Sequence, residues 1–200
     1  MQPYSDAVRF HPWIGASYGY NSQWTLPLLI LGESHYDTNG ELLQVDSTQK
    51  VLTEYVQLRP KHLQYYTKVM NSVMGISAPS DELTRSHFWN SVAFYNYVQY
   101  IVPKGEPPTQ DMWDRSRGAF HEVISKLKPF CILVVSTRLW QNINSHISLS
   151  SDFYVNNKIM KSGRIGNAHV GGIPHPTSSY GYKPLDWNPA ITHLIKESAK

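Results

Sequence analysis

Two unbroken apolar runs stand out along the chain, and each predicts a buried strand of a parallel sheet. They cover residues 26–31 and 130–135, and the run 168–173, which His169 interrupts, is expected to be a last strand. Runs of this length without polar interruption are typical of strands that are covered on both faces. The aromatic and β-branched run 88–98 predicts a further strand at its start, which Asn90 interrupts.

Between these runs, apolar positions recur at helical spacing, and capping or breaking residues mark the boundaries. The predicted helices are one that Asp46 or Ser47 caps and Pro60 ends, one over 63–74 followed by Gly75, one over 110–127 capped by Thr109, a short one over 138–142, and a C-terminal one that starts at Asn188 and Pro189. Residues 143–163 give no assignable pattern. Residues 1–25 are rich in turn formers and are expected to be an irregular segment packed on the first strand.

Helices that alternate with buried strands are the pattern of a parallel α/β fold. We therefore expect a single domain over residues 1–200. Its predicted architecture is a three-layer α/β/α sandwich with a central, mainly parallel sheet of about four strands.

The composition sets limits on the class of protein. Two hundred residues with 41% apolar content can bury one sizeable core. No stretch is long and apolar enough for a membrane span, and the first residues lack the basic start and apolar centre of an export signal. We expect a cytoplasmic protein with no membrane partner. Cys131 is the only cysteine, so an intramolecular disulfide is excluded, and its apolar run indicates a core residue.

The charge and the aromatic content permit a nucleic-acid partner without requiring one. The formal net charge is +3, and the chain holds 13 tyrosines and 6 tryptophans. Rings in polar surroundings, as at 18–20 and 180–182, can stack on bases while nearby cations meet phosphates. The simpler interpretation, that such rings bridge core and surface, holds for most of them.

Groups able to do chemistry follow the first predicted strand directly. After Gly32 come Glu33, Ser34, His35, Tyr36 and Asp37. In open α/β sheets, ligands bind in the crevice at the carboxyl ends of the strands. The sequence therefore predicts a site there.

Three segments together resemble the uracil-DNA glycosylase superfamily. They are Gly-Glu-Ser-His-Tyr at 32–36, Phe-Trp-Asn-Ser-Val at 88–92, and His-Pro-Thr-Ser at 175–178. The order of the intervening elements also fits, because a Pro-Pro-Thr loop precedes the helix 110–127 and a third apolar strand. The resemblance spans roughly residues 26–180 and implies that family's fold.

The resemblance also implies roles for individual residues. Glu33 matches the carboxylate that holds or activates water, and Tyr36 matches a tyrosine packed against the C5 edge of the base. Asn90 matches the amide that reads the base, and His175 matches the histidine that stabilises charge on the departing base. Such a pair suits this chemistry, because a carboxylate can stabilise the sugar cation while a donor stabilises the base anion.

The residues after His175 match the loop that wedges into the duplex. The expected DNA-binding residues are Thr177, Ser178, Ser179, Tyr180, Tyr182 and Arg138. The usual wedge position is occupied by Ser179, so Tyr180 or Tyr182 would have to serve, although both can also be ordinary loop aromatics.

Ser34 and His35 depart from the family pattern. We expect them to line the base pocket. Their departure from the family pattern indicates a pocket rebuilt for a base other than uracil. Glucosylated hydroxymethylcytosine of phage DNA is a candidate, although Tyr36 at the C5 edge argues against a bulky substituent.

The expected function is hydrolytic excision of uracil or a modified pyrimidine from DNA. No lysine lies within the three motifs, so a Schiff base has no obvious nucleophile. No His or Cys spacing indicates a metal site, and we expect no cofactor and a monomer. Two alternatives stay open: a catalytically silent DNA or nucleotide binder on the same fold, and a serine esterase that uses Ser34 with His175.

Overall fold

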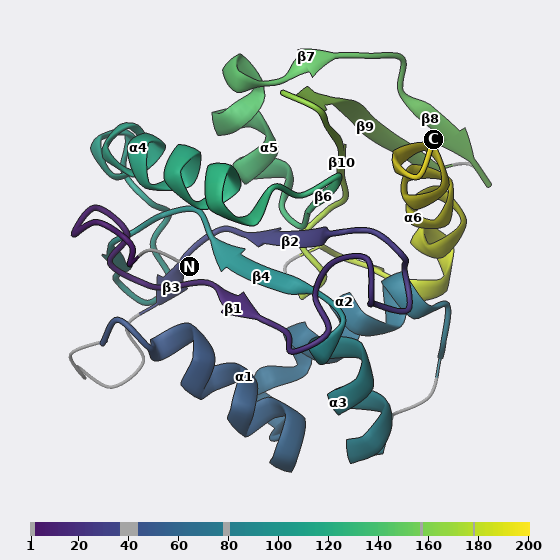
Figure 1. Ribbon diagram of the computed structural model, residues 1–200, viewed down its shortest axis with the longest axis horizontal. Helices are drawn as coiled ribbons and strands as arrows, with labels where there is room; N and C mark the ends of the chain where they lie inside the picture. Colours follow the sequence, from purple (N-terminus) through teal and green to yellow (C-terminus); the bar gives the residue numbers. More distant parts are fainter. Residues whose placement is uncertain (1–2, 37–43, 78–80, 157, 178) are drawn as a thin grey trace.

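The computed structural model describes residues 3–36, 44–77, 81–156, 158–177 and 179–200, and it contains a central sheet with helices on both faces (Figure 1). Four neighbouring strands of this sheet are parallel. In spatial order they are β4 (Ala93–Asn96), β2 (Leu28–Gly32), β6 (Cys131–Val134) and β10 (Ala168–Gly172). The two apolar runs thus form β2 and β6, and the expected last strand over 168–173 forms β10, as the sequence predicts.

Antiparallel strands extend the sheet at both edges, so it is larger than the expected four strands. β1 (Trp13–Ile14) pairs with β4 at one edge. At the other edge β9 (Lys158–Ile165) pairs with β10, β7 (Ser148–Leu149) and β8 (Phe153–Val155). Residues 1–25, expected to be irregular, therefore contain the short strand β1. Residues 143–163, which give no assignable pattern in the sequence, contain β7, β8 and most of β9.

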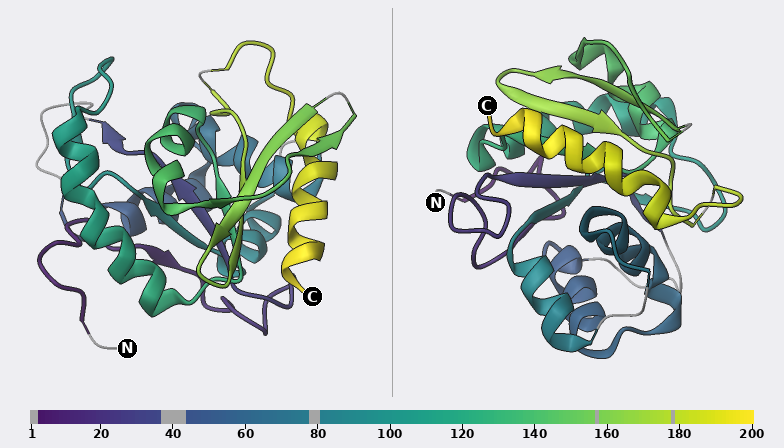
Figure 2. Two further views of the ribbon diagram at one scale, coloured as in Figure 1. Left: turned by 90° about the horizontal axis from the view of Figure 1, so that it is seen from above. Right: turned by 90° about the vertical axis from the view of Figure 1, so that its right-hand side faces the viewer.

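Successive residues of β2 serve two different cores, because side chains alternate across a strand. Leu29 and Leu31 pack with the residues of α4 (Gln110–Leu127) and α5 (Thr137–Ile143). Leu28 and Ile30 pack on the opposite face, with α1 (Ser47–Leu58), α2 (Gln64–Met74), α3 (Glu82–Asn90) and α6 (Pro184–Ser198). Figure 2 shows α4 and α6 on opposite sides of the strands. The chain is therefore mixed α/β, with layers of helices around a mostly parallel sheet.

The predicted caps are present at two of the helices. Thr109 accepts a hydrogen bond from the Met112 backbone N–H at 3.3 Å, and Gly75 closes α2 at φ +70°. That left-handed conformation suits glycine, which has no Cβ to clash. Two 3₁₀ turns, Lys61–Leu63 (η1) and Asn144–His146 (η2), precede α2 and follow α5.

The predicted strand at the start of 88–98 is wrong. Residues 82–90 form α3, whose Asp81 cap accepts a hydrogen bond from Thr84 N–H at 2.7 Å, and the strand begins only at Ala93. The start of the C-terminal helix also differs from the prediction. It begins at Pro184, where the missing N–H costs no helical hydrogen bond, and Pro189 lies within its second turn.

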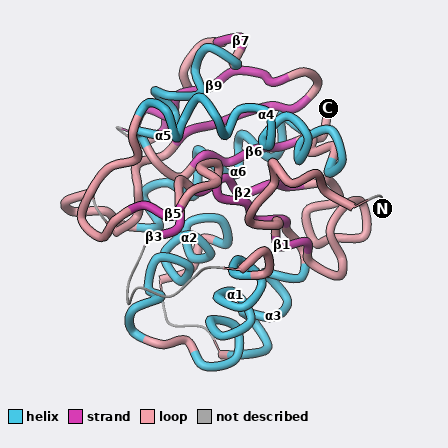
Figure 3. The backbone as a smooth tube through the Cα atoms, turned by 90° about the vertical axis from the view of Figure 1, so that its left-hand side faces the viewer, coloured by secondary structure: helices cyan, strands magenta, loops and turns pink. Residues whose placement is uncertain are grey.

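A second, two-stranded sheet lies beside the end of β2. It pairs β3 (His35–Tyr36) with β5 (Ile101–Val102) in parallel, and Figure 3 shows the two strands side by side. Of the helices in the described part of the chain, none combines the length and apolar character that crossing a bilayer requires.

Candidate functional site

The four parallel strands end at one edge of the sheet, and chemistry-bearing residues gather there. Gly32 is in register with Asn96, and Val134 with both Leu31 and Gly172. The residues just beyond these strand ends line a pocket of about 740 Å³, within the range of pockets that bind small ligands. Its described lining is Glu33, Ser34, His35, Tyr36, Tyr65, Tyr66, Asn96, Gly105, Glu106, Pro107, Ser136, Thr137, Arg138, His175, Thr177 and Ser179.

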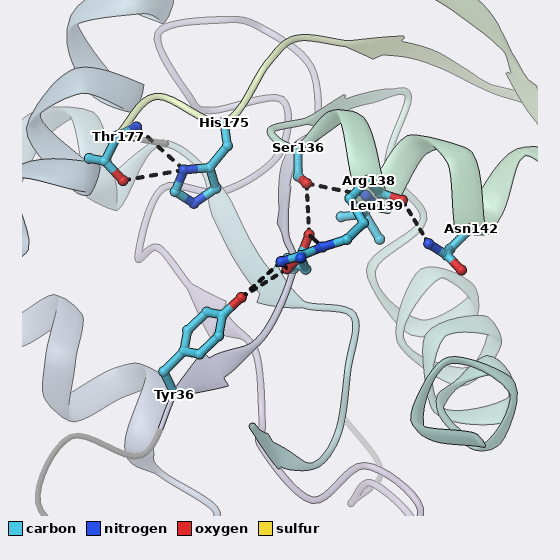
Figure 4. Close-up of polar contacts among 8 residues, drawn as sticks. Tyr36, Ser136, Arg138, Leu139, Asn142, His175 and Thr177 are labelled. Atoms are coloured by element: carbon cyan, nitrogen blue, oxygen red, sulfur yellow. Dashed lines mark hydrogen bonds and ion pairs between the residues drawn. The ribbon is translucent and has the colours of Figure 1, made fainter. Parts of the chain in front are cut away.

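Glu33 is held by three side chains from two segments. Its Oε2 accepts hydrogen bonds from Ser136 Oγ at 2.8 Å and from Arg138 Nε at 3.1 Å. Its Oε1 accepts from the Tyr36 hydroxyl at 3.0 Å and from Arg138 Nη2. Figure 4 shows the side chains of Tyr36, Ser136 and Arg138 pointing toward one another. The side chain is 5% exposed, whereas that of Arg138 is 44% exposed, so the ion pair has one buried and one open partner.

The pKa of Glu33 lies below its ordinary value of 4.5. Burial alone raises this pKa, but the hydrogen bonds from Arg138 and Ser136, the positive charge of Arg138 and the hydrogen bond from Tyr36 together outweigh it. Glu33 is therefore an ionised carboxylate at neutral pH.

Ser136 gives this arrangement its rigidity. The residue caps α5, and its Oγ accepts a hydrogen bond from the Leu139 backbone N–H at 3.2 Å while donating to Glu33. One hydroxyl thus fixes the start of α5 relative to the end of β2. Because Arg138 lies in the first turn of α5, the cap also sets where its guanidinium meets Glu33.

His175 lies beyond β10 with its ring packed on Tyr65, at 5.0 Å between centroids and 27° between planes. The Thr177 backbone N–H donates to His175 Nδ1 at 3.3 Å, so a neutral ring carries its proton on Nε2. That nitrogen points away from Thr177 (Figure 4). Burial lowers the pKa of His175; the Glu33 charge opposes this, and the charges of Arg138 and Lys68 add to it. The imidazole is therefore a neutral N–H donor at pH 7.

Asn90, expected to read the base, does not lie at the site. It ends α3, at the far end of β4 from the pocket, and its Nδ2 donates to Ser86 Oγ at 3.1 Å. Asn96, at the carboxyl end of β4, lines the pocket instead and is 5% exposed. Among the described residues, no hydrogen bond engages its carboxamide.

The missing side chain of Gly32, at the end of β2, leaves the space that the Asn96 carboxamide occupies. A Cβ on Gly32 would lie 2.3 Å from Asn96 Oδ1 and 2.9 Å from Phe94 Cζ. Both distances are shorter than van der Waals contact. Glycine at position 32 is therefore required for Asn96 to sit where it does.

His35 and Ser34 line the pocket, but His35 is packed into the core and the Ser34 hydroxyl is buried. His35 Nε2 lies 3.0 Å from Thr48 Oγ1, and its ring packs edge-on against Phe10. Burial lowers its pKa to about 4, so it is neutral at pH 7. Ser34 Oγ is buried, and it forms no hydrogen bond with His35 or His175. A serine nucleophile needs an adjacent base, so this geometry does not support the esterase alternative.

Acidification is expected to destabilise the fold through His35. Its folded pKa of about 4 lies below the unfolded value of 6.5, so the unfolded state binds more protons between these pH values. The free energy of unfolding should therefore fall by up to about 3 kcal/mol as the pH drops through this window. Urea denaturation of wild type and His35→Gln between about pH 7 and 5 tests this, because the variant should lose much of the slope. Equal slopes would assign the pH dependence to other groups.

The loop after His175 is only partly where the resemblance places it. Thr177 and Ser179 line the pocket, and the Tyr180 side chain is fully exposed. The Tyr182 hydroxyl lies 2.7 Å from Ser72 Oγ and its ring stacks on Trp187, so this side chain packs against α2 and α6, which does not favour it as the wedge. Ser178 and Asp37 lie outside the described residues.

Sequence reasoning missed Asn96, Tyr65 and Glu106 as lining residues. Asn96 had a usable signal, since it is the first polar residue after the apolar run 92–95 and ends a parallel strand as Gly32 does. Tyr65 precedes the buried Tyr66 on α2, and Glu106 lies in a proline-rich loop. Neither position differs in pattern from ordinary surface residues.

Comparison with known proteins adds no relative: the family models that were searched give no match to the chain, and none of the curated proteins matches it either. Within the residues that the structure describes, no group of three or more His, Cys, Asp or Glu side chains is placed to hold a metal ion.

Proposed function

We propose that this protein is a DNA glycosylase of the uracil-DNA glycosylase type, which hydrolyses the N-glycosidic bond of a flipped-out uracil or modified pyrimidine. The observation that carries the proposal is the convergence of Glu33, Asn96 and His175 in one pocket at the carboxyl ends of the parallel strands. An ionised carboxylate, an amide and a neutral N–H donor are the groups that this reaction needs.

Each group has a defined task. The Asn96 carboxamide can pair with the hydrogen-bonding edge of a pyrimidine, while the rings of Tyr36, Tyr65 and Tyr66 give it surfaces for stacking. As the bond breaks, negative charge on the base is met by His175 Nε2–H, and the positive charge on the sugar by the field of Glu33. Removing the base from the duplex costs a few kcal/mol, which contacts of this kind offset.

The half-exposed guanidinium of Arg138 suits the sugar-phosphate side of the substrate. Two of its nitrogens bind Glu33, and its side chain remains 44% exposed at the pocket. A cation in this position can meet a phosphate next to the flipped nucleotide. This keeps Arg138 as a proposed DNA-binding residue.

Incubation with a panel of DNAs tests the proposal. The panel contains uracil, hydroxymethylcytosine, glucosylated hydroxymethylcytosine or only unmodified bases, and abasic sites are counted. We expect abasic sites on one member, and we expect Asn96→Ala to slow their formation about 5- to 150-fold by removing a base contact worth about 1–3 kcal/mol.

Asn90→Ala is the matched control, because Asn90 is an asparagine outside the pocket. It should leave the number of abasic sites near the wild-type level. An equal loss in both variants would show that Asn96 has no special part in base recognition.

A second function, a catalytically silent DNA or nucleotide binder, is favoured by one observation. The Arg138 ion pair and the bonds from Ser136 and Tyr36 occupy the Glu33 carboxylate fully, as in a structural ion pair. This alternative predicts DNA binding with no abasic sites on any panel member.

A further inference from the structure

Glu33 is poorly placed to take a proton from water. A carboxylate offers about four lone-pair positions, and its two oxygens accept four hydrogen bonds from Tyr36, Ser136 and Arg138. Its pKa is also lowered, which makes it a weak base. If the pocket hydrolyses a glycosidic bond, another group has to activate the water.

Glu106 is the other carboxylate among the described residues that line the pocket. The residue is exposed, and the hydrogen bonds and ion pairs of the described residues leave its carboxylate without a partner. Its oxygens can therefore accept a hydrogen bond from water. Glu33 and Glu106 thus differ in the way that paired catalytic carboxylates differ: one is fixed by donors and one is open.

The backbone fixes Glu106 at the rim of the pocket. Its N–H donates to the Pro103 carbonyl at 3.1 Å, and Gly105 has a φ of +85° in the tight turn that this bond closes. Pro107 and Pro108 follow and restrict the chain on the other side.

The turn is also tied to the Glu33 cluster. It leaves β5 directly after Val102, and Val102 pairs with Tyr36, the residue that donates to Glu33. A single strand pair therefore sets both carboxylates at one pocket.

We infer that Glu106 is a catalytic residue that takes a proton from the attacking water, an inference that rests on the proposed glycosylase function. The bond between C1′ and the base nitrogen breaks, and its electron pair leaves with the base. The water oxygen forms the new bond to C1′, one water proton passes to the Glu106 carboxylate and then to solvent, and the base anion takes up a proton from solvent. Glu33 stabilises the sugar cation and does not change its protonation.

Single-turnover base release tests this with wild type, Glu106→Gln and Glu82→Gln, on the panel DNA that wild type cleaves. Glu82 is an exposed glutamate on α3, so its variant is the matched control. We expect Glu106→Gln to be slower by about 100-fold, the usual effect of losing a general base. DNA affinity, measured by fluorescence anisotropy, should stay within about twofold of wild type for both variants.

Azide separates water activation from a structural role. In Glu106→Ala, sodium azide should restore base release in a concentration-dependent way and leave a strand with azide at C1′, because this anion needs no general base. Base release by Glu106→Gln at the wild-type rate, or an inactive Glu106→Ala that forms no azide product, would overturn the inference and leave the proposed function standing. No base release by wild type on any DNA would overturn the proposed function itself, and the inference with it.

Discussion

Replacing His175 with alanine is expected to slow base release by roughly 100- to 1,000-fold, equivalent to about 2.7–4 kcal/mol of transition-state stabilisation. The reason is the fixed tautomer: Thr177 N–H binds Nδ1, so Nε2 carries the proton. This donor is matched to charge that appears on the base only as the bond breaks, so the loss should fall on the chemical step. DNA affinity should change far less than the rate.

Single-turnover kinetics at saturating protein measure this effect without product release. His62→Ala is a suitable control, because the His62 side chain is 69% exposed. His175→Gln keeps a side-chain donor and should retain more activity than His175→Ala. An alanine variant that releases base at the wild-type rate would remove His175 from the mechanism.

The second large expected effect is a loss of folding stability when the Glu33–Arg138 ion pair is broken. Its size depends on whether the buried charge of Glu33 is left behind. Arg138→Ala should lower the free energy of unfolding by about 2–4 kcal/mol at neutral pH, because it leaves a buried carboxylate without its cation. This loss of stability is slightly smaller than the loss expected on breaking a fully buried ion pair, because the Arg138 side chain is 44% exposed. Adding Glu33→Gln should restore part of the loss, because the buried charge is then gone.

Urea denaturation of the two single variants and the double variant measures this coupling. Lys50→Ala is the matched control, since it breaks an exposed ion pair with Asp46 and should cost no more than about 0.5 kcal/mol. Without Arg138 the pKa of Glu33 rises, so the destabilisation should shrink as the pH falls and the carboxyl is protonated. An Arg138→Ala variant as stable as Lys50→Ala would show that Ser136 and Tyr36 alone stabilise the charge.

The central strands could be predicted because their burial leaves a direct trace in the sequence. Strands β2, β6 and β10 lie between helix layers, so both faces of β2 and β6 must be apolar. Strand β9, which pairs with β10 on one side and with β7 and β8 on the other, leaves no such trace. Its buried positions include Ser162 and Gly163, and its exposed positions are Ile159, Lys161 and Arg164, so apolar alternation is absent.

The error at 88–98 explains the error in the site. Phe88 and Trp89 are buried at the end of α3, and two adjacent aromatics before an apolar run have the composition of a strand. Tertiary packing, not local propensity, makes them helical. Because the predicted strand starts too early, Asn90 is expected at the site, whereas Asn96 lines the pocket.

Glu33 and His175 could be placed at one site from sequence because each follows a predicted parallel strand. Their partners could not, since hydrogen bonds between segments about a hundred residues apart, as from Ser136 to Glu33, depend on the register of β2 and β6. The packing of His35 against Thr48 and Phe10 likewise depends on contacts between separate segments, so the sequence carries no signal for it.

The most direct test of the central claim is a mass measurement after reaction in water labelled with heavy oxygen. The protein is incubated with an equimolar amount of each panel DNA, and the masses of the free base and of the DNA strand are measured separately by mass spectrometry. The proposed hydrolysis predicts an intact free pyrimidine that carries no heavy oxygen and an abasic strand that has lost that base. Bound DNA that stays intact on every member of the panel would contradict it and identify the pocket as a binding site without glycosylase activity.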